Sequence, residues 1–155
     1  MSYRSELIEL HNRLSKTLDE ERGAAREKRY EKGYRTAREN LDDLVDKDSF
    51  VEYGQLAIAA QKSRRELEEL RTETAADGII TGFGKINSEI LDDKKALSAI
   101  IINDYSVLAG TQGYYHHKKL DRICETAEKQ NLPVVMYTEG GGGRPGDTDV
   151  HVQFA

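Results

Sequence analysis

The sequence predicts an α/β fold in its second half, preceded by a helical N-terminal region. Three apolar, β-branched runs predict strands, at residues 79–86, 96–108 and 133–137. A helical spacing of apolar residues fills 114–130, between the second and third runs. The runs 96–108 and 133–137 are each followed by a glycine-containing turn. The order strand, strand, helix, strand predicts a helix packed on a sheet. Turns at the carboxyl ends of such strands are where open α/β sheets bind ligands.

Composition limits the class of protein. A chain of 155 residues is long enough for one domain with a core. The net charge of −5 argues against general attraction to nucleic acid or to an anionic membrane. A single cysteine, Cys124, permits no internal disulfide and suits a reducing compartment. The sequence shows neither a transit peptide nor an apolar run of membrane-spanning length, so we expect a cytoplasmic protein, or a mitochondrial matrix protein if the source is eukaryotic.

Residues 3–30 predict one long helix, because Leu7, Leu10 and Leu14 recur at spacings of three and four among charged residues. A narrow apolar stripe on a charged helix is typical of a coiled-coil arm, or of a helix lying across a partner subunit. The basic residues around Arg29 could contact nucleic acid. Because acidic residues alternate with them, we favour a solvated face.

Two shorter helices are predicted at about 37–46 and about 63–71. The texture changes at the turn Asp77-Gly78, after which β-branched residues dominate. We therefore divide the chain into a helical N-terminal region, residues 1–73, and an α/β domain, residues 74–155.

The first of the short helices begins with a capping box, in which Thr36 and Glu39 satisfy each other's backbone N–H groups. Arg35 and Arg38 flank this helix start. An arginine at such a position can pair with a phosphate group of a ligand or with a nearby carboxylate of the protein.

Within the α/β part, Gly82 and Gly84 interrupt the first strand and predict bends or the close approach of another backbone. The run 96–108 shows no alternation, so both of its faces should be covered. In the helix 114–130, Cys124 falls among the apolar positions and is expected to be a buried structural thiol.

The four glycines at 140–143 allow two interpretations. Such a run is typical of a flexible linker. Directly after a strand, it also exposes backbone N–H groups to a ligand. A phosphate-binding loop would need Gly-Lys-Ser/Thr, whereas Arg144-Pro145 follows here. The adjacent His116 and His117 point to different sides of a helix, so we expect a surface pair and no metal site. A backbone oxyanion hole remains as the chemistry of this run.

Four segments together carry a family resemblance, at residues 36–52 (TARENL…DSFVE), 76–84 (ADGIITGFG), 103–113 (NDYSVLAGTQG) and 133–144 (PVVMYTEGGGGR). In order and spacing they resemble the N-terminal part of the carboxyltransferase component of biotin-dependent acyl-CoA carboxylases. The glycine run is similar to that of a subgroup that includes single-chain long-chain acyl-CoA carboxylases. This family has the crotonase-like (ClpP/crotonase) spiral of strand-strand-helix units, so the resemblance implies part of that fold.

The resemblance also implies a reaction. The family moves a carboxyl group from N-carboxybiotin to the α-carbon of an acyl-CoA, and backbone N–H groups hold the thioester enolate. Matched to the family motif, the oxyanion-hole residues fall on Gly141 and Gly142. Arg35, Arg38, Ala109 and Gly110 are the expected coenzyme A contacts. The family's Asp-Ser before the glycines is Glu139-Gly140 here, and Gly143 stands where the family has alanine, which could shift the pairing by one residue.

The resemblance further implies partners and leaves alternatives. Biotin would be carried on a biotin carboxyl carrier domain or subunit and charged by a biotin carboxylase; we expect a homo-oligomer, and no metal in this segment. Because the family's carboxyltransferases are much longer, we expect the chain to be part of a larger enzyme and inactive alone. The alternatives are a biotin-independent crotonase-type acyl-CoA enzyme or decarboxylase subunit, and a non-catalytic acyl-CoA-binding or assembly module.

Overall fold

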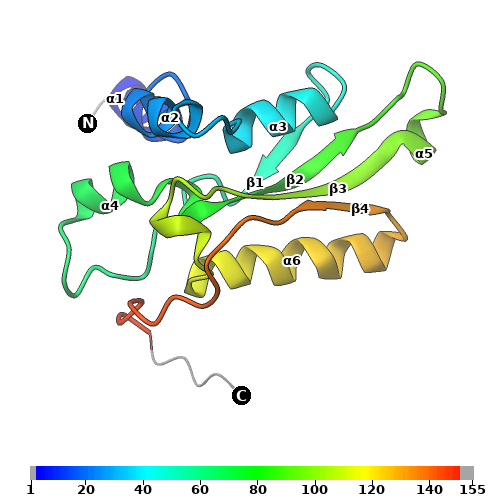
Figure 1. Ribbon diagram of the computed structural model, residues 1–155. Helices are drawn as coiled ribbons and strands as arrows, with labels where there is room; N and C mark the ends of the chain where they lie inside the picture. Colours follow the sequence, from blue (N-terminus) through cyan, green and yellow to red (C-terminus); the bar gives the residue numbers. More distant parts are fainter. Residues whose placement is uncertain (1–2, 151–155) are drawn as a thin grey trace.

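A four-stranded sheet forms the centre of the computed structural model, which describes residues 3–150 (Figure 1). Its strands are β1 (Val51–Tyr53), β2 (Ile79–Lys85), β3 (Leu97–Asn103) and β4 (Val134–Tyr137), in the order β1-β2-β3-β4. Strand β2 is antiparallel to both β1 and β3, and β4 is parallel to β3. Residues 1–2 of the predicted N-terminal region and residues 151–155 of the predicted α/β domain lie outside the described residues.

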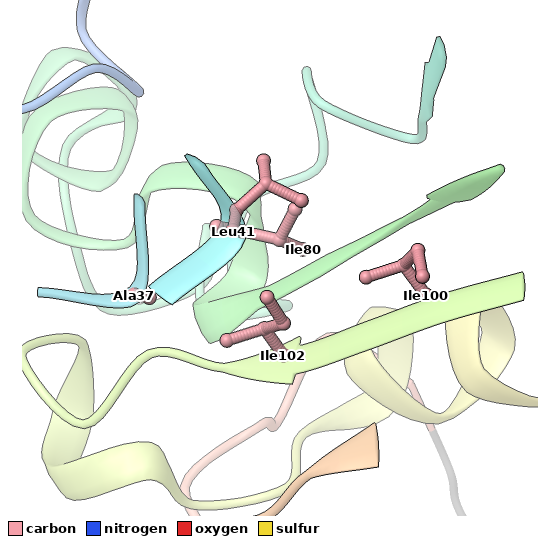
Figure 2. Close-up of a cluster of buried hydrophobic side chains, with 5 residues drawn as sticks. All are labelled: Ala37, Leu41, Ile80, Ile100 and Ile102. Carbon is pink, nitrogen blue, oxygen red and sulfur yellow. The ribbon is translucent and has the colours of Figure 1, made fainter. Parts of the chain in front are cut away.

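Helices cover both faces of this sheet, so the molecule has three layers (Figure 1). On one face, α3 (Ala37–Leu44) packs Ala37 and Leu41 onto Ile80, Ile100 and Ile102, as Figure 2 shows. On the other face, α6 (Tyr114–Gln130) packs its apolar side onto the sheet, in a cluster formed by Ile79, Ala99, Ile101, Ile123 and Ala127. Neighbouring residues of β2 and β3 serve opposite faces because side chains alternate along a strand.

These observations confirm the predicted α/β arrangement of strand, strand, helix and strand. Helix α6 has the predicted bounds, 114–130. Strand β3 is buried on both faces from Ser98 onward, as its lack of alternation predicted. The glycine prediction in β2 also holds at Gly82, where a Cβ atom would lie 2.3 Å from the carbonyl oxygen of Val51 on the neighbouring strand.

The single long helix predicted over 3–30 is wrong. The structure has α1 (Tyr3–Ser15) and α2 (Gly23–Tyr30), joined by turns. Contacts from distant parts of the chain hold the connection: Asp19 accepts a hydrogen bond from Thr36, and Arg22 forms a 2.5 Å ion pair with Asp104. These contacts outweigh the local helical pattern, which carries no information about residues so far along the chain.

Two predicted helix bounds also differ, and a strand lies where helices were expected. The helix predicted over 63–71 is α4 (Leu67–Glu73), and the N–H groups of Lys62 and Ser63, which precede it, bind the carboxylate of Asp149. The helix predicted over 37–46 ends at Leu44. Strand β1 lies within the region predicted to be helical.

The strand predicted over 96–108 stops at Asn103, where Asp104 accepts hydrogen bonds from Ser106 and turns the chain. The elements not foreseen are α5 (Asp93–Ala96) and the 3-10 turns η1 (Ala75–Gly78) and η2 (Leu108–Gly110). No helix within residues 3–150 is both long enough and apolar enough to cross a bilayer.

Candidate functional site

Two glycine-containing turns meet at the carboxyl ends of β3 and β4. The backbones approach so closely that a Cβ atom on Gly110 would lie 2.2 Å from the carbonyl oxygen of Glu139, and one on Gly140 would lie 2.3 Å from that of Gly110. The N–H of Gly141 donates to the carbonyl of Ala109, at 3.0 Å. Because hydrogen bonds tie the glycine run to the turn after β3, its interpretation as a flexible linker is wrong.

A buried ion pair fixes the end of the glycine run. The side chain of Arg144 is 5% exposed and that of Asp77 is fully buried, and the two are joined by a short hydrogen bond. The remaining nitrogens of Arg144 donate to the hydroxyl of Thr111 at 3.2 Å and to its carbonyl at 2.6 Å. One arginine thus connects the glycine run, the turn after β3 and the 3-10 turn that precedes β2.

The same carboxylates cap helix α6. Asp77 accepts a hydrogen bond from the N–H of His116, and Asp147 accepts one from the N–H of Tyr114, both at 2.8 Å. These N–H groups have no partner within the helix, and negative charge near them is stabilised by the helix dipole. Burial raises the pKa of Asp77, while Arg144 beside it acts in the opposite direction. Asp77 also has a left-handed backbone, with φ of 51°.

The two residues predicted to form the oxyanion hole lie in different environments. The N–H of Gly141 is occupied by the carbonyl of Ala109. The N–H of Gly142 has no hydrogen-bond partner within residues 3–150, although its carbonyl accepts from Gln112. Gly142 has φ of +93°, and a Cβ atom there would meet nothing within 4 Å. This backbone therefore offers a free donor beside open space.

Two cavities adjoin the strand ends. One of about 890 Å³ lies against α2 and is lined by Lys28, Lys32 and Ala109, and a second of about 350 Å³ is lined by Arg35 and Thr138. Their common walls are Arg29, Tyr34 and Glu139. The two cavities therefore form neighbouring parts of one surface depression at the ends of β3 and β4.

Arg29 and Glu139 form the wall between these cavities. Both terminal nitrogens of Arg29 donate to the carboxylate, at 2.7 and 2.8 Å, and the guanidinium lies 5.0 Å from the ring centre of Tyr34. The sequence favoured a solvated face for Arg29, and this is wrong, since the residue is buried. Its partner lies 110 positions later in the chain, which no local pattern reveals.

The two arginines predicted to contact coenzyme A differ in exposure and in their partners. Arg35 is 60% exposed, pairs with Asp43 at 2.7 Å and lines the smaller cavity. Arg38 is partly buried and forms a two-pronged ion pair with Glu52, at 2.6 and 3.1 Å, and it also donates to the carbonyl of Thr17. The guanidinium of Arg38 is thus fully engaged within the chain.

Three residues on α6 differ from expectation or were missed. His116 is fully buried, which makes the predicted surface pair with His117 wrong. Cys124 is exposed, because one residue beyond the buried Ile123 is a rotation of about 100° around the helix. Lys119, to which the sequence gave no role, is buried and donates to the carbonyls of Ala76 and Ile79. Burial lowers the pKa of Lys119 to about 8.

Metal-ligating side chains do not cluster in the described part of the chain. Residues 3–150 contain no group of three or more His, Cys, Asp or Glu side chains arranged to hold a metal ion. The charged side chains that line the cavities at the strand ends include Lys28, Lys32, Arg35 and Glu139.

Comparison with known protein families gives one match, to the carboxyl transferase domain, over residues 28–152. Among curated relatives, the biotin-dependent acetyl-/propionyl-coenzyme A carboxylase beta5 subunit of Mycobacterium leprae is 34% identical, over 89% of this chain and 23% of its own length. The methylmalonyl-CoA decarboxylase subunit alpha of Veillonella parvula is 30% identical, over 87% of this chain and 25% of its own length. The chain thus spans about a quarter of the length of these relatives.

Two solved structures share the fold. A single-chain, multi-domain long-chain acyl-CoA carboxylase superposes with a TM-score of 0.90 and 51% identity, over 95% of this chain and 15% of its own. The transcarboxylase 12S hexamer, solved with methylmalonyl-CoA and methylmalonic acid bound, superposes with a TM-score of 0.65 and 27% identity, over 81% of this chain and 22% of its own. The α/β layer is therefore part of a crotonase-like fold, as the sequence motifs implied.

Proposed function

This chain belongs to the carboxyl transferase domain family, and from that membership we propose that its protein transfers a carboxyl group between biotin and the α-carbon of an acyl-CoA. The biotin group supplies the carboxyl group when it is bound. The part of the reaction assigned to this chain is the binding of the thioester carbonyl, whose oxygen gains negative charge when the α-carbon becomes nucleophilic.

The observation that carries the proposal is the free N–H of Gly142 at the end of β4. A donor fixed in place before the reaction stabilises charge that develops on an oxygen, and removal of one such donor costs about 2.7–4 kcal/mol where it has been measured. We assign Gly142 as the oxyanion donor. Gly141 orients it, because the Gly141 N–H is held by the carbonyl of Ala109. The Arg144–Asp77 pair holds the other end of the loop.

For coenzyme A, we propose that the phosphate groups bind on the depression beside α2. Arg35 lines the smaller cavity, while Lys28 and Lys32 line the larger one. The depression that the two cavities form therefore has three cationic side chains on its surface. Ala109 lines the same surface, and Gly110 allows the close contact with Glu139 that shapes it. We assign Arg38 a supporting role, because its ion pair with Glu52 connects α3 to β1.

We propose that the partners are a biotin carboxyl carrier and a biotin carboxylase, together with further copies of the chain. The relatives are named as subunits of acyl-CoA carboxylases, and the transcarboxylase is described as a hexamer. The apolar stripe of α1 supports an assembly role, since Leu7, Ile8 and Leu10 are exposed.

A second candidate is decarboxylation as the physiological direction of the same reaction. It is favoured by the similarity to the Veillonella decarboxylase subunit. Both candidates use the same donor for the thioester oxygen, so the site alone serves either direction.

The test uses the complete protein that contains these residues, supplied with a carboxylated acyl-CoA with and without free biotin. We expect loss of the carboxyl group only when biotin is present. Turnover without biotin would instead support a biotin-independent crotonase-type enzyme. Acyl-CoA binding without any turnover would contradict the enzymatic assignment and leave a binding or assembly module.

A further inference from the structure

The amide side chain of Asn103 is buried and unpaired at the carboxyl end of β3. Asn103 is 6% exposed, and its Oδ1 atom has no hydrogen-bond partner within residues 3–150. A buried polar group without a partner is costly, and the large majority of such groups are satisfied. The arrangement is therefore expected of a group that waits for a ligand.

The surroundings of Asn103 supply the space for that ligand. Asn103 lines the cavity of about 350 Å³, together with Thr138 and Tyr137 of the β4 end and Arg35 of the segment before α3. A Cβ atom on Gly140 would lie 3.6 Å from Nδ2 of Asn103. The unpaired amide thus sits in a cavity that directly adjoins the glycine run.

We propose that Asn103 binds an amide group of the pantetheine arm of the acyl-CoA, with Oδ1 accepting from the amide N–H. This inference rests on the proposed function, because it names the part of the substrate that this cavity receives. A neutral amide oxygen is an acceptor, and the N–H of the substrate amide is the donor it needs. One such bond would satisfy the Oδ1 atom, which the protein itself leaves unpaired.

Position favours the pantetheine amide nearest the sulfur over the adenine ring, whose edge also carries donors and acceptors. When Gly142 holds the thioester oxygen, the first amide of the arm is only two methylene groups beyond the sulfur. Asn103 adjoins Gly140, two residues before Gly142. The adenine ring lies at the far end of the coenzyme, beyond both amides and the diphosphate.

The experiment measures the dissociation constants of an acyl-CoA and of its analogue in which an ester replaces the amide nearest the sulfur. The ester keeps the shape and the carbonyl but lacks the N–H. We expect the complete wild-type protein to bind the ester about tenfold more weakly, as for the loss of one hydrogen bond that leaves a buried acceptor unpaired. Asn103→Ala should bind both ligands equally. The acyl-phosphopantetheine pair, which lacks the nucleotide, should show the same difference.

Ser98→Ala is the matched control, because Ser98 is equally buried near the other end of β3 and its hydroxyl bonds only the carbonyl of Ala96. It should keep the full amide-to-ester difference. Asn103→Ala should retain the thermal stability of the wild type, since it removes an unpaired polar group.

If the ester bound more weakly than the amide by the same factor in wild type and in Asn103→Ala, the inference would be overturned. An effect that disappears when the nucleotide is removed would also overturn it, because this would assign Asn103 to the adenine. Absence of biotin-dependent turnover, with the Asn103 effect intact, would instead refute the proposed reaction alone. Absence of any acyl-CoA binding would refute both.

Discussion

At the scale of single residues, the site depends on charges inside the molecule. Arg144 and Asp77 are both buried, and each is satisfied by the other and by backbone groups. Removing one member of such a pair leaves an uncompensated buried charge, which costs about 3–5 kcal/mol. Exposed pairs contribute about 0–1 kcal/mol, because water and salt screen them.

We therefore predict that Arg144→Met lowers the free energy of unfolding by about 3–5 kcal/mol, because Asp77 would keep a buried charge without its partner. Lys129→Met is the control, since Lys129 and Glu125 form an exposed pair at 4.0 Å. Urea denaturation of both variants measures the difference. An Arg144→Met variant as stable as the control would show that the pair does not hold the loop.

A second prediction concerns pH and His116. Burial lowers the pKa of His116 to about 4, from 6.5. Between these values the unfolded chain binds a proton that the folded chain excludes, so stability is complete above pH 6.5 and falls as the pH drops towards 4. The loss is about 3 kcal/mol, at 1.36 kcal/mol per unit of pKa.

Denaturation curves at pH 7 and pH 4.5 test this expectation in wild type, His116→Phe and the control His117→Gln. The stability difference between the two pH values should shrink in His116→Phe and persist in His117→Gln. The same dependence in wild type and His116→Phe would assign the effect to carboxylates whose pKa is lower in the folded chain, such as Glu39, whose pKa is lowered by the hydrogen bond from Tyr30.

Among these residues, local sequence predicted the charge pattern but not the partners. Arg29 and Arg144 bind Glu139 and Asp77 across 110 and 67 positions. His116 is buried because the N-terminus of α6 docks against Asp77, which is a tertiary contact. A signal was present in the shared motifs, where Asp77 and Arg144 both occur, but spacing alone does not say that they meet.

At the scale of elements, the two turns after β3 and β4 act as one unit. The backbone around Gly140 occupies the space that a Cβ atom on Gly110 would need, and the backbone of Gly110 occupies the space that a Cβ atom on Gly140 would need. The sequence located both turns, since glycine after a strand is a local signal. It left open whether the four glycines form a linker, because only the hydrogen bonds to Ala109 and Gln112 decide that question.

We predict that Gly140→Ala forces the two turns apart, because the new Cβ would lie 2.3 Å from the carbonyl oxygen of Gly110. The free energy of unfolding should fall by about 1–3 kcal/mol, as for other overpacked sites. Gly143→Ala is the control, since a Cβ there meets nothing within 4 Å. Amide hydrogen exchange at Gly141 should quicken only in Gly140→Ala. Equal protection in both variants would contradict the close packing of the turns.

At the scale of the whole molecule, the sequence predicted the layer order and the family, and missed the way the N-terminal helices attach. Periodicity and β-branched runs are local, so the strands around α6 were found. The break between α1 and α2 is held by Asp19 and Arg22 through residues far along the chain. The N-terminal helices thereby form one wall of the depression that holds the proposed coenzyme A site.

The central claim is that the N–H of Gly142 stabilises the thioester oxygen during carboxyl transfer. Gly142 and Gly143 both face open space, but only Gly142 has a positive φ, of +93°, which an alanine adopts with strain. Gly142→Ala should therefore move the donor, whereas Gly143→Ala places the residue that the family carries at that position.

The most direct measurement is biotin-dependent decarboxylation of a carboxylated acyl-CoA by the two variants in the complete protein. We expect Gly142→Ala to lower kcat by about 10²–10³-fold, the usual effect of losing one oxyanion donor, with the dissociation constant for acyl-CoA nearly unchanged. Gly143→Ala should keep kcat within about threefold of wild type, since no strain is introduced. Equal kcat values in Gly142→Ala and Gly143→Ala would contradict the assignment of Gly142 as the oxyanion donor.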